Sequence, residues 1–163
     1  MYEQFLRNWL PEYNQQAKEL NFTVHEIITL ASIIEKESGQ ATEQATISSV
    51  FHNRLKNGMR LDSDPTLVYG LQDFDGVVLD KHKLTDSAYN TYKILGLPKG
   101  PIANPGKTAI EAALNPVESQ YLYFVADAKG GHVFSTNLND HINAVNAYRA
   151  ALRSRTEQAQ ALQ

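Results

Sequence analysis

The sequence predicts an α+β fold, mainly helical and in a single domain, with a small antiparallel β-sheet formed by one hairpin. Apolar residues recur at helical spacing in several segments, whereas only two short segments are rich in β-branched and aromatic residues. These two segments are neighbours in the sequence, which favours an antiparallel hairpin. The length of 163 residues suits one domain, and we expect residues 1–163 to form it.

Two adjoining segments predict the main helices of the first half. From Val24 to Ser38 the apolar residues form a broad stripe. Asn21 or Thr23 can supply the amino-terminal cap, and Gly39 stands where a helix would stop. A second helix is expected from about residue 43 to residue 56, because its apolar residues again share one face.

The rest of the first 120 residues predicts short elements separated by turns. A helical pattern in residues 6–13 is ended or bent by Pro11. Residues 59–71 are expected to be an extended loop or short strand, broken at Asp64-Pro65. The further elements expected are a surface excursion at residues 72–83, a short helix capped by Thr85 or Asp86 and closed by Gly96, an irregular stretch at residues 100–106, and a short helix opened by Thr108 and ending before Pro116.

The last third predicts the hairpin and a final helix. Residues 121–126 and 133–134 have strand composition and flank a Gly-Gly turn. A helix is expected to begin near Asn137 or Asn139, and the Gln- and Ala-rich tail after Arg153 is expected to fray.

Composition excludes several functional classes. Fifteen Lys and Arg against eighteen Asp and Glu give a net charge of −3 without a cationic cluster, so nucleic acid is not expected as a partner. The chain has no cysteine, which excludes zinc ribbons, iron–sulfur clusters and thiol nucleophiles. The five histidines lack metal-ligand spacing, and no phosphate-binding loop is present, so we expect neither metal nor cofactor. No apolar stretch approaches the roughly 18 residues of a membrane span, and we expect no membrane contact by this chain itself.

The segment from residue 31 to residue 38 contains the best candidates for catalysis. Helical rotation places Glu35 and Glu37 at opposite edges of the apolar stripe, with Ser38 near its middle. A carboxyl group at the edge of an apolar face can be partly desolvated, which raises its pKa and suits a general acid. Helical geometry does not choose between the two glutamates. Each could be a catalytic acid, or could merely flank a buried face. The inward hydroxyl of Ser38 slightly favours Glu37, because a buried hydroxyl needs a partner.

The eight tyrosines suggest a type of ligand. Several stand beside amides and hydroxyls in residues 89–92 and 121–124, and such mixtures suit polysaccharides, whose sugar faces pack on aromatic rings. Aromatic core residues with satisfied hydroxyls are an equal alternative for each single tyrosine.

Seven segments, in this order along residues 28–149, resemble the YceG-like (MltG) endolytic murein transglycosylases. Any one of them would be weak evidence, but seven in the family's order are specific. They are ASIIEKES (31–38), VFHNRL (50–55), GMRL (58–61) leading into DPTLVYG (64–70), YNTY (89–92), GLPKGPIANPG (96–106), YLYFVA (121–126) and GGHVF (130–134).

The resemblance implies a reaction and a catalytic residue. The family cleaves the β-1,4 bond between N-acetylmuramic acid and N-acetylglucosamine inside peptidoglycan strands, without water, and leaves 1,6-anhydro-muramyl ends. Glu37 would act first as acid and then as base, with Ser38 orienting it. The candidates for the glycan groove are Asn53, Asp64, Thr66, Tyr69, Asn90, Tyr92 and Asn104, and each could instead serve structure alone. Arg54 would pair with an acid or with a substrate peptide carboxylate.

The resemblance also implies a location and partners. Full-length members have a membrane helix and a LysM-like module before this domain, and both are absent here, so we expect an isolated catalytic domain from the periplasmic or extracytoplasmic side of the membrane. Peptidoglycan strands are the expected partner, and peptidoglycan synthases are further candidates. Two alternatives stay open: a hydrolytic muramidase that uses Asp62 or Asp64 as second carboxylate, and a non-catalytic glycan-binding module.

Overall fold

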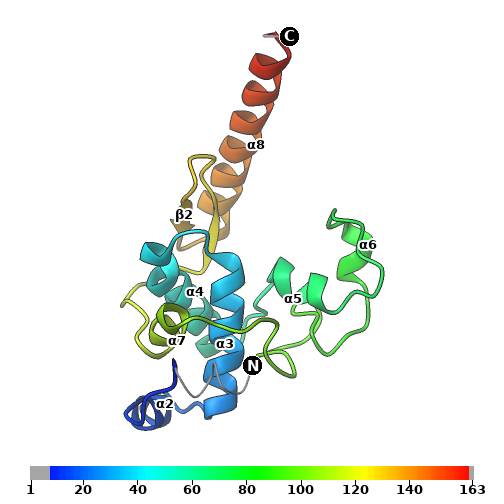
Figure 1. Ribbon diagram of the computed structural model, residues 1–163. Helices are drawn as coiled ribbons and strands as arrows, with labels where there is room; N and C mark the ends of the chain where they lie inside the picture. Colours follow the sequence, from blue (N-terminus) through cyan, green and yellow to red (C-terminus); the bar gives the residue numbers. More distant parts are fainter. Residues whose placement is uncertain (1–7, 162–163) are drawn as a thin grey trace.

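The computed structural model describes residues 8–161 and confirms a mostly helical fold with a two-stranded antiparallel sheet. The helices of the body surround α3, and α8 runs past the hairpin so that its last turns project away from the body (Figure 1). The elements are α2 (Tyr13–Glu19), α3 (Val24–Glu37), the 3-10 helix η1 (Ala41–Glu43), α4 (Gln44–Lys56), α5 (Asp64–Tyr69), α6 (Asp80–Lys83), α7 (Lys107–Leu114), β1 (Tyr123–Ala126), β2 (His132–Ser135) and α8 (Leu138–Ala161). None of the helices within residues 8–161 is long and apolar enough to cross a membrane.

Helix α3 forms the centre of the core and ends at the candidate acid. Its apolar residues Ile27, Leu30, Ala31, Ile33 and Ile34 are buried, and the helix packs against α4 and α7. The predicted cap is confirmed, since Thr23 Oγ1 accepts the Glu26 amide while the Glu26 carboxylate accepts the Thr23 amide. The helix stops at Glu37 because Ser38 has an extended backbone (φ −100°, ψ 118°). Glu37 therefore stands at the carboxyl end of a rigid, buried helix.

The predictions for residues 59–71 and 85–96 were wrong in part. Pro65 does not break an extended segment but lies in the first turn of α5, where a missing amide hydrogen costs nothing. Residues 85–96 form turns instead of a helix. There the Asn90 side chain donates to the carbonyls of Lys83 and Thr85 and accepts the Tyr92 amide, which replaces helical hydrogen bonds.

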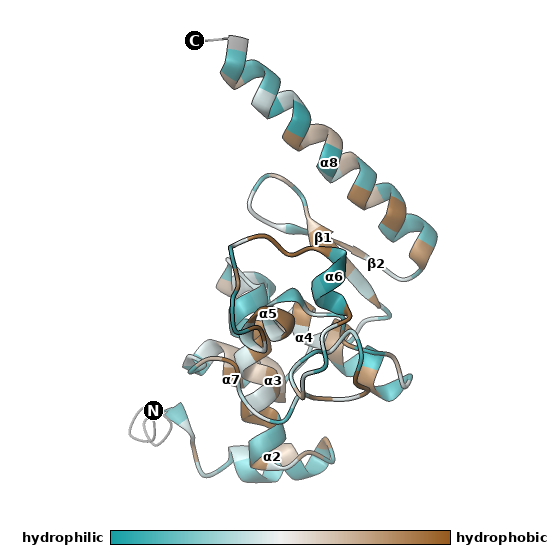
Figure 2. Cartoon of the chain, turned by 90° about the vertical axis from the view of Figure 1, so that its right-hand side faces the viewer, coloured by the Kyte–Doolittle hydropathy of each residue, from teal (hydrophilic) through white to brown (hydrophobic). Residues whose placement is uncertain are grey.

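Two other boundaries differ from expectation. Helix α7 is present, but Gly106 precedes it as the cap residue, and Thr108 lies inside its first turn. Of the helical pattern expected in residues 6–13, residues 1–7 lie outside the described part, and α2 begins at Tyr13. The excursion that carries α6 is hydrophilic at α6 itself (Figure 2).

The predicted hairpin and final helix are both confirmed. Strand β1 pairs with β2 in antiparallel register, with Phe124 opposite Phe134. Phe124 also packs edge-on against Phe51 of α4, with 5.8 Å between ring centroids, and this contact fixes the hairpin to the core. Helix α8 packs along the hairpin and stays helical to Ala161, beyond the point where fraying was expected.

Candidate active site

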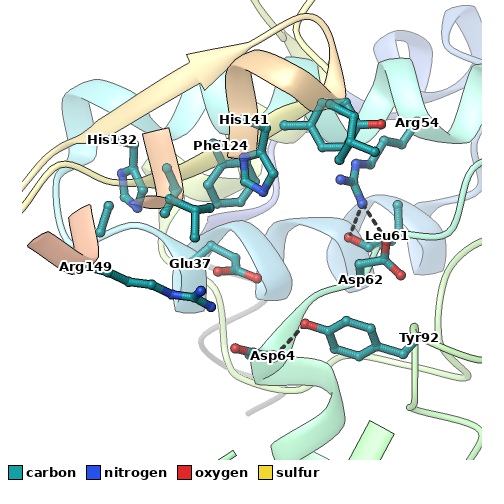
Figure 3. A pocket seen from close by; sticks show the side chains of 15 residues that line it. Glu37, Arg54, Leu61, Asp62, Asp64, Tyr92, Phe124, His132, His141 and Arg149 are labelled. Carbon is teal, nitrogen blue, oxygen red and sulfur yellow. Dashed lines mark hydrogen bonds and ion pairs between the residues drawn. The ribbon is translucent and has the colours of Figure 1, made fainter. Parts of the chain in front are cut away.

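A cavity of about 640 Å³ opens between the carboxyl end of α3, the hairpin and α8. Glu37 lies at its centre in Figure 3, with Asp64 and Tyr92 below it and His132 and His141 above it. One wall comes from the residues around α5, and the other from the hairpin and one face of α8. The α5 side contributes Leu61, Asp62, Asp64 and Tyr92, and the opposite side contributes Tyr123, Phe124, Val125, Ala126, His132, Leu138, His141, Val145 and Arg149.

Glu37 has the properties of a group that both donates and accepts a proton. Burial is the main cause that raises its pKa to about 7, and the charge of Asp64 acts in the same direction. The hydroxyl of Ser63 donates to Glu37 Oε1 at 2.6 Å and lowers the pKa, as do the nearby His132 and Arg54. Near neutral pH the carboxyl group therefore exists in both protonation states, which general acid–base catalysis requires.

The two candidate glutamates differ in what they contact. Glu37 lines the cavity, whereas Glu35 Oε2 accepts the amide of Gly106 at 3.2 Å, next to the start of α7. A carboxylate at a helix amino terminus is a favourable structural interaction. The fold thus gives Glu35 a structural partner and leaves Glu37 facing the cavity.

Ser63 is held in place by two threonines. Its backbone amide donates to Thr91 Oγ1 at 3.0 Å, and its carbonyl accepts the Thr66 hydroxyl at 2.7 Å. The hydroxyls of Thr66 and Thr91 lie 2.7 Å apart, and both residues are buried. Thr66 was predicted to bind substrate, but in this structure it supports the residue that contacts Glu37.

Tyr92 and Asp64 form a second polar group in the cavity. The Tyr92 hydroxyl donates to Asp64 Oδ1 at 2.7 Å. Burial and the negative charge of Asp64 raise the pKa of Tyr92 well above its ordinary value, so the phenol keeps its proton. Asn90, another predicted substrate residue, is fully buried and holds the Tyr92 amide at 3.0 Å. Of this segment, Tyr92 lines the cavity and Asn90 positions it.

Arg54 and Asn53 bind backbone on the other side of the site. Arg54 donates to the carbonyls of Leu122, Arg60 and Leu61, and its Nη1 lies 3.2 Å from Asp62 Oδ2. The expected pairing of Arg54 with an acid is therefore present. Asn53, predicted to bind substrate, donates to the carbonyls of Ser119 and Tyr121, each at 3.0 Å, and holds the entry to β1.

Three predicted residues lie away from the cavity. Ser38 was expected to face inward beside Glu37, but the helix ends before it, and its hydroxyl donates to the Gln40 carbonyl. Tyr69 is 52% exposed and packs against Tyr89. Asn104 is exposed in the irregular stretch. The cavity at Glu37 thus includes the candidates Asp64 and Tyr92 but not Asn104, and the hairpin and α8 form its second wall.

Sequence reasoning missed Ser63 and the α8 part of that second wall. Leu138, His141, Val145 and Arg149 are spaced by three or four residues, so helical periodicity could have placed them on one face. Nothing in the sequence indicated that this face meets Glu37. Within residues 8–161, no group of three or more His, Asp or Glu side chains is arranged to hold a metal ion.

Comparisons with known proteins identify the family of this chain. The chain matches the YceG-like family over residues 1–147 and belongs to that family. It is 42% identical over 141 residues to the endolytic murein transglycosylase of Bacillus subtilis strain 168, which covers 86% of this chain and 39% of that protein. The corresponding protein of Streptococcus pneumoniae serotype 2 is 37% identical over 140 residues, covering 81% of this chain and 25% of the relative.

A solved structure also resembles this chain. The crystal structure of a yceG-like protein from Listeria monocytogenes superposes with a TM-score of 0.74 at 42% identity, covering 82% of this chain and 43% of that one. The chain therefore spans well under half the length of these relatives.

Proposed function

We propose that this chain is the catalytic part of an endolytic murein transglycosylase. It would cleave the β-1,4 bond between N-acetylmuramic acid and N-acetylglucosamine within peptidoglycan strands and leave 1,6-anhydro-muramyl ends. The observation that carries the proposal is Glu37, a carboxyl group with a pKa of about 7 in a cavity lined by aromatic and polar side chains. The names of the two curated relatives support it.

The proposed reaction uses Glu37 twice. The protonated carboxyl group gives its proton to the leaving oxygen as the C1–O4 bond breaks, and the acetamido group of the substrate stabilises the cationic centre. The C6 hydroxyl then forms the C1–O6 bond, and its proton restores Glu37. Between the steps Glu37 is an anion, which the Ser63 hydroxyl at 2.6 Å and the nearby Arg54 stabilise.

A hydrolytic muramidase is the second candidate, because Asp64 shares the cavity with Glu37. A second carboxylate could activate water or attack the sugar. Asp64 interacts with Glu37 strongly enough to raise its pKa, and it is held by the Tyr92 hydroxyl. Asp62 also lines the cavity, but it is paired with Arg54. The masses of the products distinguish the two reactions, since anhydro ends are about 18 Da lighter than hydrated ends.

The test is digestion of purified peptidoglycan by the chain and by two matched variants. Glu37→Gln keeps the shape but removes the titratable proton, and we expect cleavage to fall by about 10²–10⁴-fold or more. Glu35→Gln changes an equally sized acid and should retain substantial activity, because Glu35 contacts Gly106 outside the cavity. Mass spectrometry of the released fragments identifies the chemistry.

Each other outcome contradicts part of the proposal. Hydrated ends would indicate the muramidase, and binding of peptidoglycan without cleavage by the folded wild-type chain would indicate a glycan-binding module. Loss of activity in Glu35→Gln but not in Glu37→Gln would show that the wrong glutamate was chosen.

The substrate also suggests where the protein works and with what. Peptidoglycan lies outside the cytoplasmic membrane, so we place the site on the periplasmic or extracytoplasmic side. Because the chain covers less than half of its relatives, we propose that the whole protein carries a membrane helix and a LysM-like module. Peptidoglycan synthases, which make the strands that this site would cut, are the proposed protein partners.

A further inference from the structure

We propose that His132, oriented by Glu43, is a second acid–base group of this site and relays the proton of the C6 hydroxyl to Glu37. The inference rests on the proposed function, since it assigns a residue to the second half of that reaction. The contacts that support it join Glu43 to His132 and are separate from those of the proposed acid, Glu37.

Glu43 holds His132 by two atoms at once. Glu43 Oε2 lies 2.7 Å from Nδ1 of the imidazole, and Oε1 accepts the His132 backbone amide at 3.1 Å. The two side chains are only 22% and 14% exposed. A carboxylate at Nδ1 fixes the hydrogen on that atom and leaves Nε2 of the neutral ring as an acceptor. This carboxylate–imidazole arrangement is the one that enzymes use to orient a histidine base.

The free edge of the ring is available to a substrate. His132 lines the cavity, and within residues 8–161 its Nε2 has no hydrogen-bond partner. The rings of Phe124 and Phe134 lie 5.5 Å and 6.3 Å away and limit its rotation. Figure 3 shows His132 on the hairpin side of the cavity, above Glu37.

The position of His132 relative to Glu37 is fixed by the chain that follows Glu37. Residues 38–43 leave the end of α3 and bind the hairpin twice, because Gln40 Nε2 donates to the Gly130 carbonyl of the turn at 2.6 Å and Glu43 binds His132 of β2. The Ser38 hydroxyl in turn binds the backbone of Gln40. A short segment thus ties the end of α3, which carries Glu37, to the hairpin that carries His132.

The proton balance closes without water or cofactor. Glu37 gives its proton to O4 as C1–O4 breaks, and the C6 hydroxyl forms C1–O6 while its proton passes to His132 Nε2. The imidazolium, stabilised by Glu43, returns that proton to the Glu37 carboxylate and restores both groups. The leaving oxygen and the C6 hydroxyl then each have their own partner, so Glu37 need not move between them.

Several other charged or titratable groups contact His132 or share its cavity. They are Glu37 of α3, Glu43 of η1, Arg54 of α4, Asp62 and Asp64 at the start of α5, Tyr92, Tyr123 of β1, and His141 and Arg149 of α8. His141 is the other imidazole, but its ring stacks on Tyr123 and its Nδ1 is buried without a partner among the described residues. Of the two rings, His132 alone has the carboxylate partner that prepares a base.

The test compares pH profiles of peptidoglycan cleavage for four variants. His132→Gln retains an amide near the position of Nε2 but cannot titrate, and His132→Asn keeps a donor toward Glu43 without reaching the cavity. We expect each to lower kcat by about 10²-fold or more with little change in KM. The acidic limb of the profile should disappear, while the alkaline limb set by Glu37 stays. Glu43→Gln should lower kcat by about tenfold or more, and His82→Gln, in α6 outside the cavity, should behave as wild type.

Rescue separates catalysis from mere support of the hairpin. Adding imidazole to His132→Ala should restore part of the anhydro product, since a free base can occupy the vacated space. Wild-type kcat in His132→Gln would overturn the inference. So would a loss that leaves both pH limbs in place and is not rescued by imidazole. If Glu37→Gln still cleaves, the proposed function itself fails; if Glu37→Gln is inactive while the His132 variants are active, this inference alone fails.

Discussion

Replacing Glu37 by glutamine should make the folded protein more stable at neutral and alkaline pH while it abolishes the proposed activity. Burial raises the pKa of Glu37 from 4.5 to about 7, so the folded state disfavours its charged form. The glutamine side chain is neutral at every pH and can still accept the Ser63 hydrogen bond. The substitution therefore removes an electrostatic cost and keeps the contact.

The pH interval and the size of this stability difference both follow from the pKa of Glu37. Between pH 4.5 and about 7 the folded state retains a proton that the unfolded chain has lost, so wild-type stability falls as pH rises through this interval. A pKa change of this size corresponds to up to about 3 kcal/mol. Because the carboxyl group reaches the cavity and keeps some contact with solvent, we treat this as the upper value. For a domain of this length it amounts to a Tm increase of up to about 10 °C in Glu37→Gln above neutrality.

Urea denaturation of wild type and Glu37→Gln over a series of pH values measures this difference. The two proteins should be nearly equally stable below pH 4.5, and the variant should gain over wild type until about pH 7. Glu35→Gln is the control, because Glu35 has a structural partner in Gly106 and should show no such gain. A difference between wild type and Glu37→Gln that does not change with pH would refute the burial argument.

Three other substitutions test the supports of the site. Ser63→Ala removes the donor at 2.6 Å from Glu37, so we expect kcat to fall about tenfold and the alkaline limb of the pH profile to move to higher pH; an unmoved limb would contradict this. Tyr92→Phe leaves Asp64 without its 2.7 Å donor and should lower the free energy of unfolding by about 1–2 kcal/mol in urea denaturation; unchanged stability would contradict this. Thr23→Ala should cost about 1 kcal/mol with unchanged cleavage, since it removes only a helix cap; a large loss of activity would show that the cap also affects the site.

The long amphipathic elements of this fold could be predicted from the sequence because their signals are local. Helix α3 has a continuous apolar stripe and a capping pair at Thr23 and Glu26, and both are readable within a few turns of chain. The hairpin has a Gly-Gly turn between two strand-like segments. Asn90 shows where such reasoning fails, because its side chain takes up backbone groups that a helix would have used.

Helical geometry narrowed the candidate acid to two residues, and it was the family resemblance that pointed to Glu37. Glu35 and Glu37 lie symmetrically about the stripe, and their difference comes from parts of the chain far away in sequence. Gly106 binds Glu35, whereas Ser63 binds Glu37 in a cavity that α8 completes. No helical pattern within residues 24–38 contains that information.

The polar residues predicted to bind glycan show how an irregular site uses its side chains. Asn53, Thr66 and Asn90 each bind backbone carbonyls or amides of neighbouring loops. Loops lack the regular partners of helices and strands, so buried backbone groups near such a site must be satisfied by side chains. Polar residues close to the catalytic group are therefore used first to build the loops. The groups left for substrate are those that line the cavity with an unused polar atom, and within residues 8–161 His132 Nε2 meets that condition.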